Sequence, residues 1–153
     1  MIKRTLLIMM LFVLAVSFLM ADKDCNSQEL TAVGGKTFTL NDFKGKKLFL
    51  LFWATWCPWC RKEIPQLKTF YEKHKEKIVI VALSLDKDKE KLHEYLKENE
   101  LPFVVAYGSK EYADCFGGIR GIPTLFVLDE NLNLQKKFVG YTPVERLEQE
   151  LNY

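Results

Sequence analysis

A pair of cysteines two residues apart lies between an apolar run and an amphipathic segment. Residues 48–53 read LFLLFW, and residues 56–60 read WCPWC. A continuous apolar run is typical of a strand that is covered on both faces. From Pro58 onward, apolar residues recur every three or four positions, which predicts a helix with one buried face formed by Ile64, Leu67, Phe70 and Tyr71. The sequence therefore places Cys57 and Cys60 where a buried strand leads into the first turn of a helix.

This position has consequences for the chemistry of the two thiols. The first backbone N–H groups of a helix have no partner within the helix and favour a nearby negative charge. We therefore expect a lowered pKa and a reactive thiolate at Cys57. Cys60 lies one turn further along, less open to solvent and close enough to form a disulfide. The pattern predicts that Cys57 attacks the disulfide of a partner and that Cys60 resolves the mixed disulfide.

Three other uses of a C-x-x-C pair are less consistent with the sequence. A zinc site needs a second pair of cysteines or histidines, and no others in the chain have that spacing. Covalent haem attachment needs a histidine after the second cysteine, where this chain has Arg61. A purely structural disulfide across so short a loop gains little stability. We therefore predict a redox pair with no metal and no cofactor.

The remaining pattern predicts one α/β domain. Its order of elements starts with parallel crossovers and finishes with a hairpin and a helix, which favours a central mixed β-sheet flanked by helices on both faces. The capping box Thr142-Pro143-Val144-Glu145 predicts the start of the last helix. The other predicted strands are residues 37–40 (an edge strand), 78–85, 103–106, 124–128 and 134–139, and the other predicted helices are residues 87–98 and 111–116.

The first 21 residues have the layout of a secretory signal. Lys3 and Arg4 precede an uncharged apolar run at residues 5–21. The segment is interpreted as a signal peptide or, if it is not cleaved, as a membrane anchor through residues 5–21. Either alternative places the body of the protein outside the cytoplasm, in a periplasm or secreted, where disulfides persist. We expect residues 22–36 to form a polar lead-in and residues 37–153 to form the folded domain.

Charge excludes two classes of partner. The formal net charge of the chain is +2. Lys3 and Arg4 account for this excess, so the body is neutral and has no electrostatic footprint for nucleic acid or for an anionic membrane surface. The two cysteines outside the C-x-x-C pair leave two alternatives open. Cys25 and Cys115 pair if their Cα atoms lie within about 7 Å, or Cys115 is a small buried apolar residue.

Several motifs together resemble the thioredoxin superfamily. They are FTLNDFKGK at residues 38–46, FWATWCPWCRKEIP at residues 52–65 and GIPT at residues 121–124. More narrowly, the chain resembles the exported branch that contains TlpA, ResA and the cytochrome c maturation reductases. The resemblance implies a thioredoxin-like fold and thiol–disulfide exchange with protein clients and with an upstream redox partner protein.

The resemblance also implies roles for individual residues. Pro123 matches the cis-proline that faces the redox pair, and Ile122 and Thr124 on either side of it would offer their backbone to an extended client segment. Trp56 matches a family aromatic beside the redox site, and Pro58 and Trp59 lie between the two cysteines, where they help to set the redox potential. The residues expected to support the active site are then Trp56, Pro58, Trp59 and Pro123.

The chain departs from thioredoxin at one position. Where thioredoxin has a buried carboxylate that helps to move the proton of the second cysteine, this chain has Leu51. Proton transfer must then use water or another acid. Asp86, at the end of an apolar run, is the candidate proton relay, and the alternative is that Asp86 caps the following helix.

The direction of electron flow is open at this point. Arg61 and Lys62 add positive charge near Cys57, and Glu63 partly offsets them. The TlpA/ResA-like context favours a reductase. The alternatives are a dithiol oxidase that introduces disulfides into exported proteins and a non-catalytic binding module on the same fold.

Overall fold

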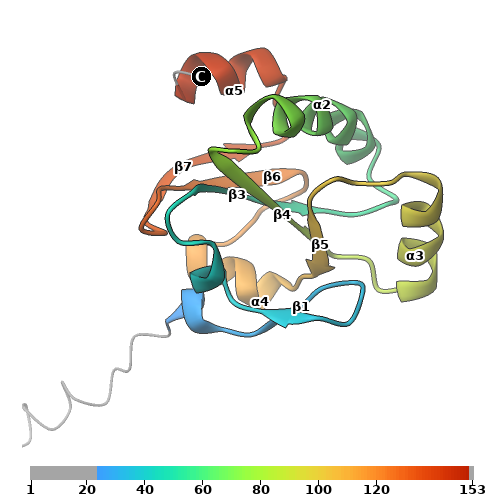
Figure 1. Cartoon of the computed structure of the whole chain (residues 1–153). Coiled ribbons are helices and arrows are strands. Elements are labelled where there is room, and N and C mark those ends of the chain that lie inside the picture. The colour runs from blue at the N-terminus through green and yellow to red at the C-terminus, as the bar shows by residue number, and fades with distance from the viewer. Residues whose placement is uncertain (1–23, 152–153) are drawn as a thin grey trace, which may run out of the picture.

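The computed structural model describes residues 24–151 (Figure 1). The predicted signal peptide or anchor at residues 1–21 lies outside these described residues. Within them, no helix is both long enough and apolar enough to cross a membrane.

A mixed sheet of five strands in the order β5-β4-β3-β6-β7 forms the centre of the fold (Figure 1). β3, β4 and β5 run parallel to one another, β6 runs antiparallel to β3, and β7 forms a hairpin with β6. This topology confirms the predicted α/β fold with a central mixed sheet. The strands are β3 (Lys47–Trp53), β4 (Ile78–Ser84), β5 (Val104–Tyr107), β6 (Thr124–Leu128) and β7 (Leu134–Val139).

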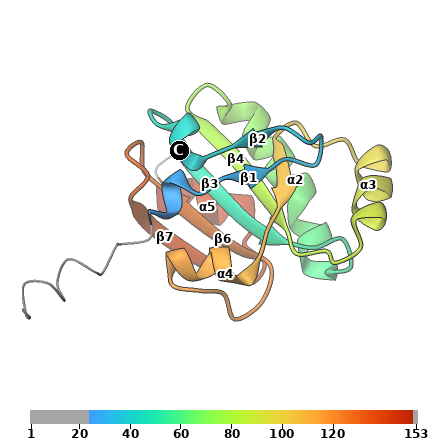
Figure 2. The same cartoon turned by 90° about the horizontal axis from the view of Figure 1, so that it is seen from below.

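Helices cover both faces of this sheet. α2, α3 and α5 pack on one face, and α4 packs on the other together with three short 3₁₀ helices and the small sheet β1-β2 (Figures 1 and 2). The helices are α2 (Pro58–His74), α3 (Lys89–Glu98), α4 (Lys110–Ala113) and α5 (Val144–Leu151), and the 3₁₀ helices are η1 (Cys25–Ser27), η2 (Leu40–Phe43) and η3 (Asp114–Phe116).

The central position of β3 in the sheet explains why residues 48–53 are all apolar. Because successive side chains of a strand point to opposite faces, Phe49, Leu51 and Trp53 pack under α2 while Leu48, Leu50 and Phe52 pack on the α4 side. All six side chains are fully buried. The strand is therefore held from both faces directly before the cysteine pair.

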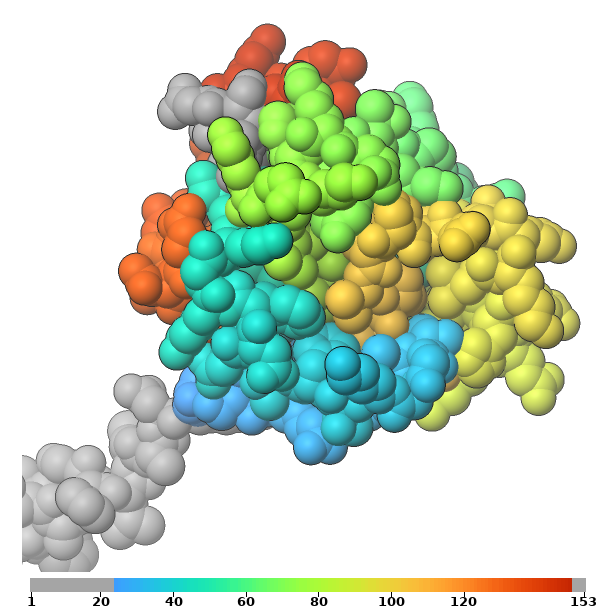
Figure 3. Space-filling model, in the orientation of Figure 1, coloured from blue at the N-terminus to red at the C-terminus, as the bar shows by residue number. Residues whose placement is uncertain are grey.

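The predicted edge strand at residues 37–40 is shorter than expected and belongs to another sheet. Thr37–Phe38 forms β2, which pairs with β1 (Leu30–Thr31). The chain then enters η2, where the Asp42 carboxylate accepts the Thr39 N–H at 2.8 Å. The N-terminal segment joins the main sheet through a bridge from Ala32 to Ala106, and Figure 3 shows it packed beside the β5 region.

The last helix begins differently from the prediction. The hydroxyl of Thr142 donates to the carbonyl of Gly140 instead of capping α5, which begins at Val144. The N–H of Val144 donates to Oε1 of Gln66 at 3.1 Å. The expected capping box was wrong because a side chain of α2 supplies the acceptor at the start of α5.

Candidate active site

The cysteine pair lies at the junction of β3 and α2. Cys57 is the N-cap of α2 and has extended backbone angles, and Pro58 occupies the first helical position, where a missing N–H costs nothing. The N–H of Cys60 donates to Sγ of Cys57 at 3.2 Å. The two cysteines form a disulfide with their Cα atoms 5.3 Å apart. Cys57 is 4% exposed and Cys60 is 0% exposed, so Cys57 is the sulfur nearer to solvent.

The segment before β6 packs against this disulfide. The Ile122–Pro123 peptide bond is cis. The carbonyl oxygen of Ile122 lies 3.7 Å from Sγ of Cys57, and Ile122 is half-buried. Thr124 is placed differently, because it is paired within the sheet with Phe52 on one side and with strand β7 on the other. Of the two residues expected to contact a client, Ile122 therefore has the more accessible backbone.

Aromatic side chains lie next to the cysteine pair. Trp56 and Trp59 are its sequence neighbours, and the half-buried Tyr141 packs against Trp59. Trp56 is 67% exposed and Trp59 is 57% exposed. The ring of Trp59 lies 5.9 Å from the ring of Tyr141, measured between centroids. The ammonium of Lys62 lies 4.6 Å from the Tyr141 centroid, a cation–π contact. Large aromatic groups that remain exposed beside a reactive pair are typical of a protein contact surface. We call Trp56, Trp59 and Tyr141 the aromatic surface.

Glu63 is a site residue that the sequence reasoning missed. Its position next to Arg61 and Lys62 suggests a surface charge that offsets theirs, but its side chain is only 1% exposed. Burial raises its pKa from the ordinary 4.5 to about 7, and the hydrogen bond from the Thr142 N–H to Oε2, at 3.4 Å, opposes this rise. Oε1 is buried and has no hydrogen-bond partner among the described residues.

The position of Glu63 in the helix carried a signal of its burial. Glu63 lies three residues after Cys60 and next to Ile64, so it falls on the inward face of α2. Among the residues that the structure describes, Glu63 is the one charged side chain that is buried. A buried carboxyl with a pKa near 7, one helical turn from a redox cysteine, is suited to exchange protons at neutral pH.

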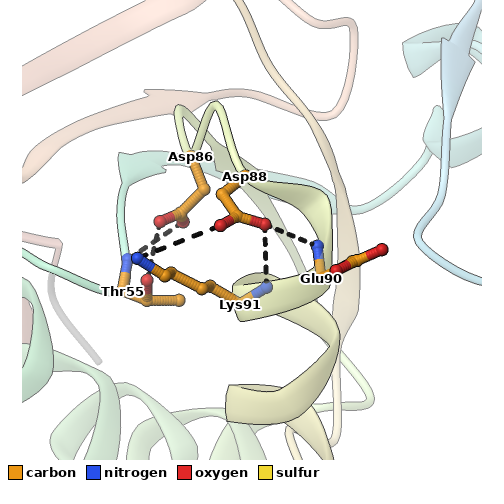
Figure 4. A network of polar contacts seen from close by, with 5 residues as sticks. All are labelled: Thr55, Asp86, Asp88, Glu90 and Lys91. Atoms are coloured by element: carbon orange, nitrogen blue, oxygen red, sulfur yellow. Dashed lines mark hydrogen bonds and ion pairs between the residues drawn. The ribbon is translucent and has the colours of Figure 1, made fainter.

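Asp86 lies beside the loop that leads into the cysteine pair (Figure 4). Its carboxylate accepts hydrogen bonds from the hydroxyl and the N–H of Thr55, at 2.6 and 3.0 Å. The alternative expectation, that Asp86 caps the next helix, was wrong. The N-cap of α3 is Asp88, which accepts the N–H groups of Glu90 and Lys91 at 3.1 and 3.3 Å.

The other two cysteines form a second disulfide. Cys25 and Cys115 are 90 residues apart in sequence, and their Cα atoms are 5.9 Å apart. This bond joins η1 to η3 on the face of the sheet opposite α2. No cluster of three or more residues able to hold a metal ion occurs between residues 24 and 151.

Comparisons with known proteins agree with this geometry. The Redoxin family model matches residues 20–151. The chain is 34% identical over 127 residues to a thiol-disulfide oxidoreductase ResA of Bacillus cereus, covering 82% of this chain and 73% of the relative. The structure is similar to that of StoA from Bacillus subtilis, with a TM-score of 0.68, 30% identity and coverage of 80% of this chain and 93% of that chain.

A second solved structure extends the comparison. It is a thiol:disulfide interchange protein of the thioredoxin family from Chlorobium tepidum TLS, with a TM-score of 0.73, 28% identity and coverage of 82% of this chain and 90% of that chain. The sequence matches, the fold and the disulfide at the start of α2 lead to one conclusion. This chain belongs to the Redoxin family, in the ResA-like branch of the thioredoxin superfamily, and is a protein thiol-disulfide oxidoreductase.

Proposed function

We propose that this protein is an extracytoplasmic reductase that transfers electrons from an upstream dithiol protein to disulfides of exported proteins. The proposed direction of electron transfer, from this protein to its clients, rests on the burial of Glu63 one helical turn from Cys60. A carboxylate in a poorly solvated position disfavours nearby thiolates. Without a stabilised thiolate the reduced form of the pair is less stable relative to the disulfide, so the pair has a low, reducing potential.

The positive charges near the pair have a weaker influence on this balance. Arg61 and Lys62 are both exposed, so water and salt screen their effect on the sulfurs. Positive charge would stabilise the thiolate and make the protein more oxidising. We therefore propose that the buried Glu63 lowers the redox potential of the pair more than the exposed Arg61 and Lys62 raise it.

Reduction of a client proceeds in two exchange steps. The thiolate of Cys57 attacks one sulfur of the client disulfide, forms a mixed disulfide and releases the other client sulfur as a thiolate. Cys60 then loses its proton and attacks Sγ of Cys57, which breaks the mixed disulfide and releases the second client thiolate. The client gains two electrons, and the protein is left with the Cys57–Cys60 disulfide seen in the structure.

Glu63 is the proposed acceptor of the proton of Cys60. Residues three apart on a helix are neighbours, and a carboxyl with a pKa of about 7 is partly ionised at neutral pH. The buried Leu51 supplies no acid at the position where thioredoxin has one. Glu63 therefore supplies, from the helix side, the carboxyl that the strand lacks.

Location and client class rest on other features. A leader of secretory type at residues 1–21 and two disulfides among the described residues favour an oxidising compartment, such as a periplasm. Membrane anchoring through residues 5–21 stays an alternative to cleavage. The likeness to ResA favours exported thiol proteins as clients, among them proteins in cytochrome c maturation. The aromatic surface provides the area on which such a client docks.

Redox titration against glutathione tests the direction of transfer. We expect a potential close to that of thioredoxin, about −270 mV, whereas a value close to that of DsbA, about −120 mV, would identify a dithiol oxidase. Insulin reduction driven by dithiothreitol provides the second measurement. A binding module that does no exchange would not accelerate insulin precipitation.

Trapping identifies the clients. A Cys60→Ser variant should accumulate mixed disulfides through Cys57, since the resolving thiol is absent. A Cys57→Ser variant is the matched control and should trap far fewer proteins, because Cys60 is completely buried. Equal trapping by both variants would contradict the assigned order of attack.

A further inference from the structure

The carboxylate of Asp86 is shared between two segments that are distant in sequence. Oδ1 accepts the hydroxyl of Thr55 at 2.6 Å, and Oδ2 accepts the N–H of Thr55 at 3.0 Å and the hydroxyl of Ser84 at 2.6 Å. The N–H of Asp86 in turn donates to Oγ of Ser84 at 3.0 Å. Ser84 is the last residue of β4 and is buried. Asp86 therefore connects a fixed point of the sheet to Thr55.

Thr55 lies in the short loop that joins β3 to the cysteine pair. The loop is closed by a hydrogen bond from the N–H of Cys57 to the carbonyl of Ala54, at 3.2 Å. Thr55 lies between these two residues, and the Asp86 carboxylate accepts hydrogen bonds from both its backbone N–H and its hydroxyl. Few orientations of the loop satisfy both bonds at once, so the path of the chain into the N-cap of α2 is defined.

We propose that Asp86 is a positioning residue for Cys57. By holding Thr55, Asp86 keeps Sγ of Cys57 in line with the N–H of Cys60 and against the carbonyl of Ile122, at 3.2 and 3.7 Å. This role rests on the proposed function, since it concerns the attacking sulfur of the exchange reaction. It differs from the proton relay expected from the sequence, because the side-chain and backbone donors that reach the carboxylate come from Thr55 and Ser84.

The two effects that Asp86 can have on Cys57 differ in sign. A negative charge near a thiol raises its pKa, so removing the charge alone would favour the thiolate. Loss of positioning moves Sγ away from the N–H groups that stabilise the thiolate, which raises the pKa. Asp86→Asn removes the charge and weakens the contacts with Thr55. Thr55→Val removes one contact and leaves all charges in place.

Figure 4 shows the matched control beside the residue to be tested. Asp88 carries the same charge two residues later and lies next to Asp86 in this view, but its hydrogen bonds go to α3. Its ion pair with Lys91 spans 3.9 Å. Asp88→Asn removes the same charge and keeps a side chain that caps helices well.

The experiment measures alkylation of Cys57 by iodoacetamide against pH, on the reduced full-length protein, with the modified residue assigned by mass spectrometry. We expect Asp86→Asn and Thr55→Val each to lower the rate at pH 7 about threefold to tenfold and to raise the midpoint by up to about one pH unit, as for the loss of a hydrogen bond to a charged group. The double variant should lose little more than the larger single loss, because both changes remove the same contact. Asp88→Asn should leave rate and midpoint unchanged.

Other outcomes would overturn the proposal. A lower midpoint in Asp86→Asn means that its charge, not its contacts, acts on Cys57. Unchanged alkylation of Cys57 together with slower resolution of a mixed disulfide identifies the proton relay instead. If Asp86→Asn does not fold, Thr55→Val alone still decides, since an unchanged rate there contradicts positioning. Alkylation needs no client, so failure of the proposed reductase function would not change these readouts.

Discussion

Replacing Glu63 by glutamine should remove a pH dependence from the stability of the protein. Burial raises the pKa of Glu63 from 4.5 to about 7, so the native state binds this proton more tightly than the unfolded chain. The free energy of unfolding therefore falls as the pH rises from about 4.5 through 7 and is constant above that range. A shift of this size corresponds to about 3 kcal/mol.

Glutamine at this position cannot ionise and keeps a carbonyl that accepts the N–H of Thr142. Its amide group is buried without a partner, which costs about 1–3 kcal/mol at every pH. We therefore expect Glu63→Gln to abolish the slope between about pH 4.5 and 7. At about pH 8 its stability should approach or exceed that of the wild type, because the unmodified protein then contains a buried carboxylate.

Urea unfolding of the oxidised protein at several pH values between about 5 and 8 measures this effect. With both disulfides intact, no cysteine titrates in this range. Glu76→Gln is the control, since Glu76 is an exposed glutamate just after α2. A wild-type curve without a slope, or a slope of equal size in Glu63→Gln, would refute the reasoning. The same variant should also slow the release of client thiols from the mixed disulfide, which stopped-flow quenching measures.

Three further predictions concern the second disulfide, the sheet and the aromatic surface. Replacing both Cys25 and Cys115 by serine should lower the free energy of unfolding by roughly 4 to 5 kcal/mol, because the bond spans 90 residues. By the same relation, loss of the Cys57–Cys60 disulfide should lower the free energy of unfolding by about 2 kcal/mol. Guanidinium titrations that gave equal losses for the two disulfides would contradict this dependence on loop length. Gly108→Ala should destabilise the protein by about 1–3 kcal/mol in thermal unfolding, since its Cβ would lie 2.8 Å from that of Leu83. Trp59→Ala should raise the KM for a protein client at least about threefold with little change in kcat, and an unchanged KM would exclude this ring from client binding.

The position of the cysteine pair and the sheet around it were predictable from local patterns. An apolar run, a C-x-x-C pair and an amphipathic segment follow one another within residues 48–71. Helix capping by Cys57 requires contacts only three residues apart. Local periodicity reports such contacts because strands and helices repeat about every two and every 3.6 residues.

The surroundings of the pair depend on segments that are far apart in the chain. Glu63 is buried because it packs beside the start of α5 and receives its hydrogen bond from Thr142, 79 residues away. Asp86 reaches Thr55 across 31 residues. The start of α5 was predicted wrongly for the same reason, since the group that accepts the N–H of Val144 is the side chain of Gln66 on another helix.

The amino-acid sequence alone determined where the C-x-x-C pair lies and which element presents it, because adjacent residues specify a strand, a turn and a helix N-terminus. Only the tertiary structure decided which acid lies buried beside them, which acid holds their loop and that Cys25 meets Cys115. A helical pattern can indicate which face is buried, but the partners of a buried polar group depend on which distant surfaces pack together, and no local pattern of residues specifies those partners.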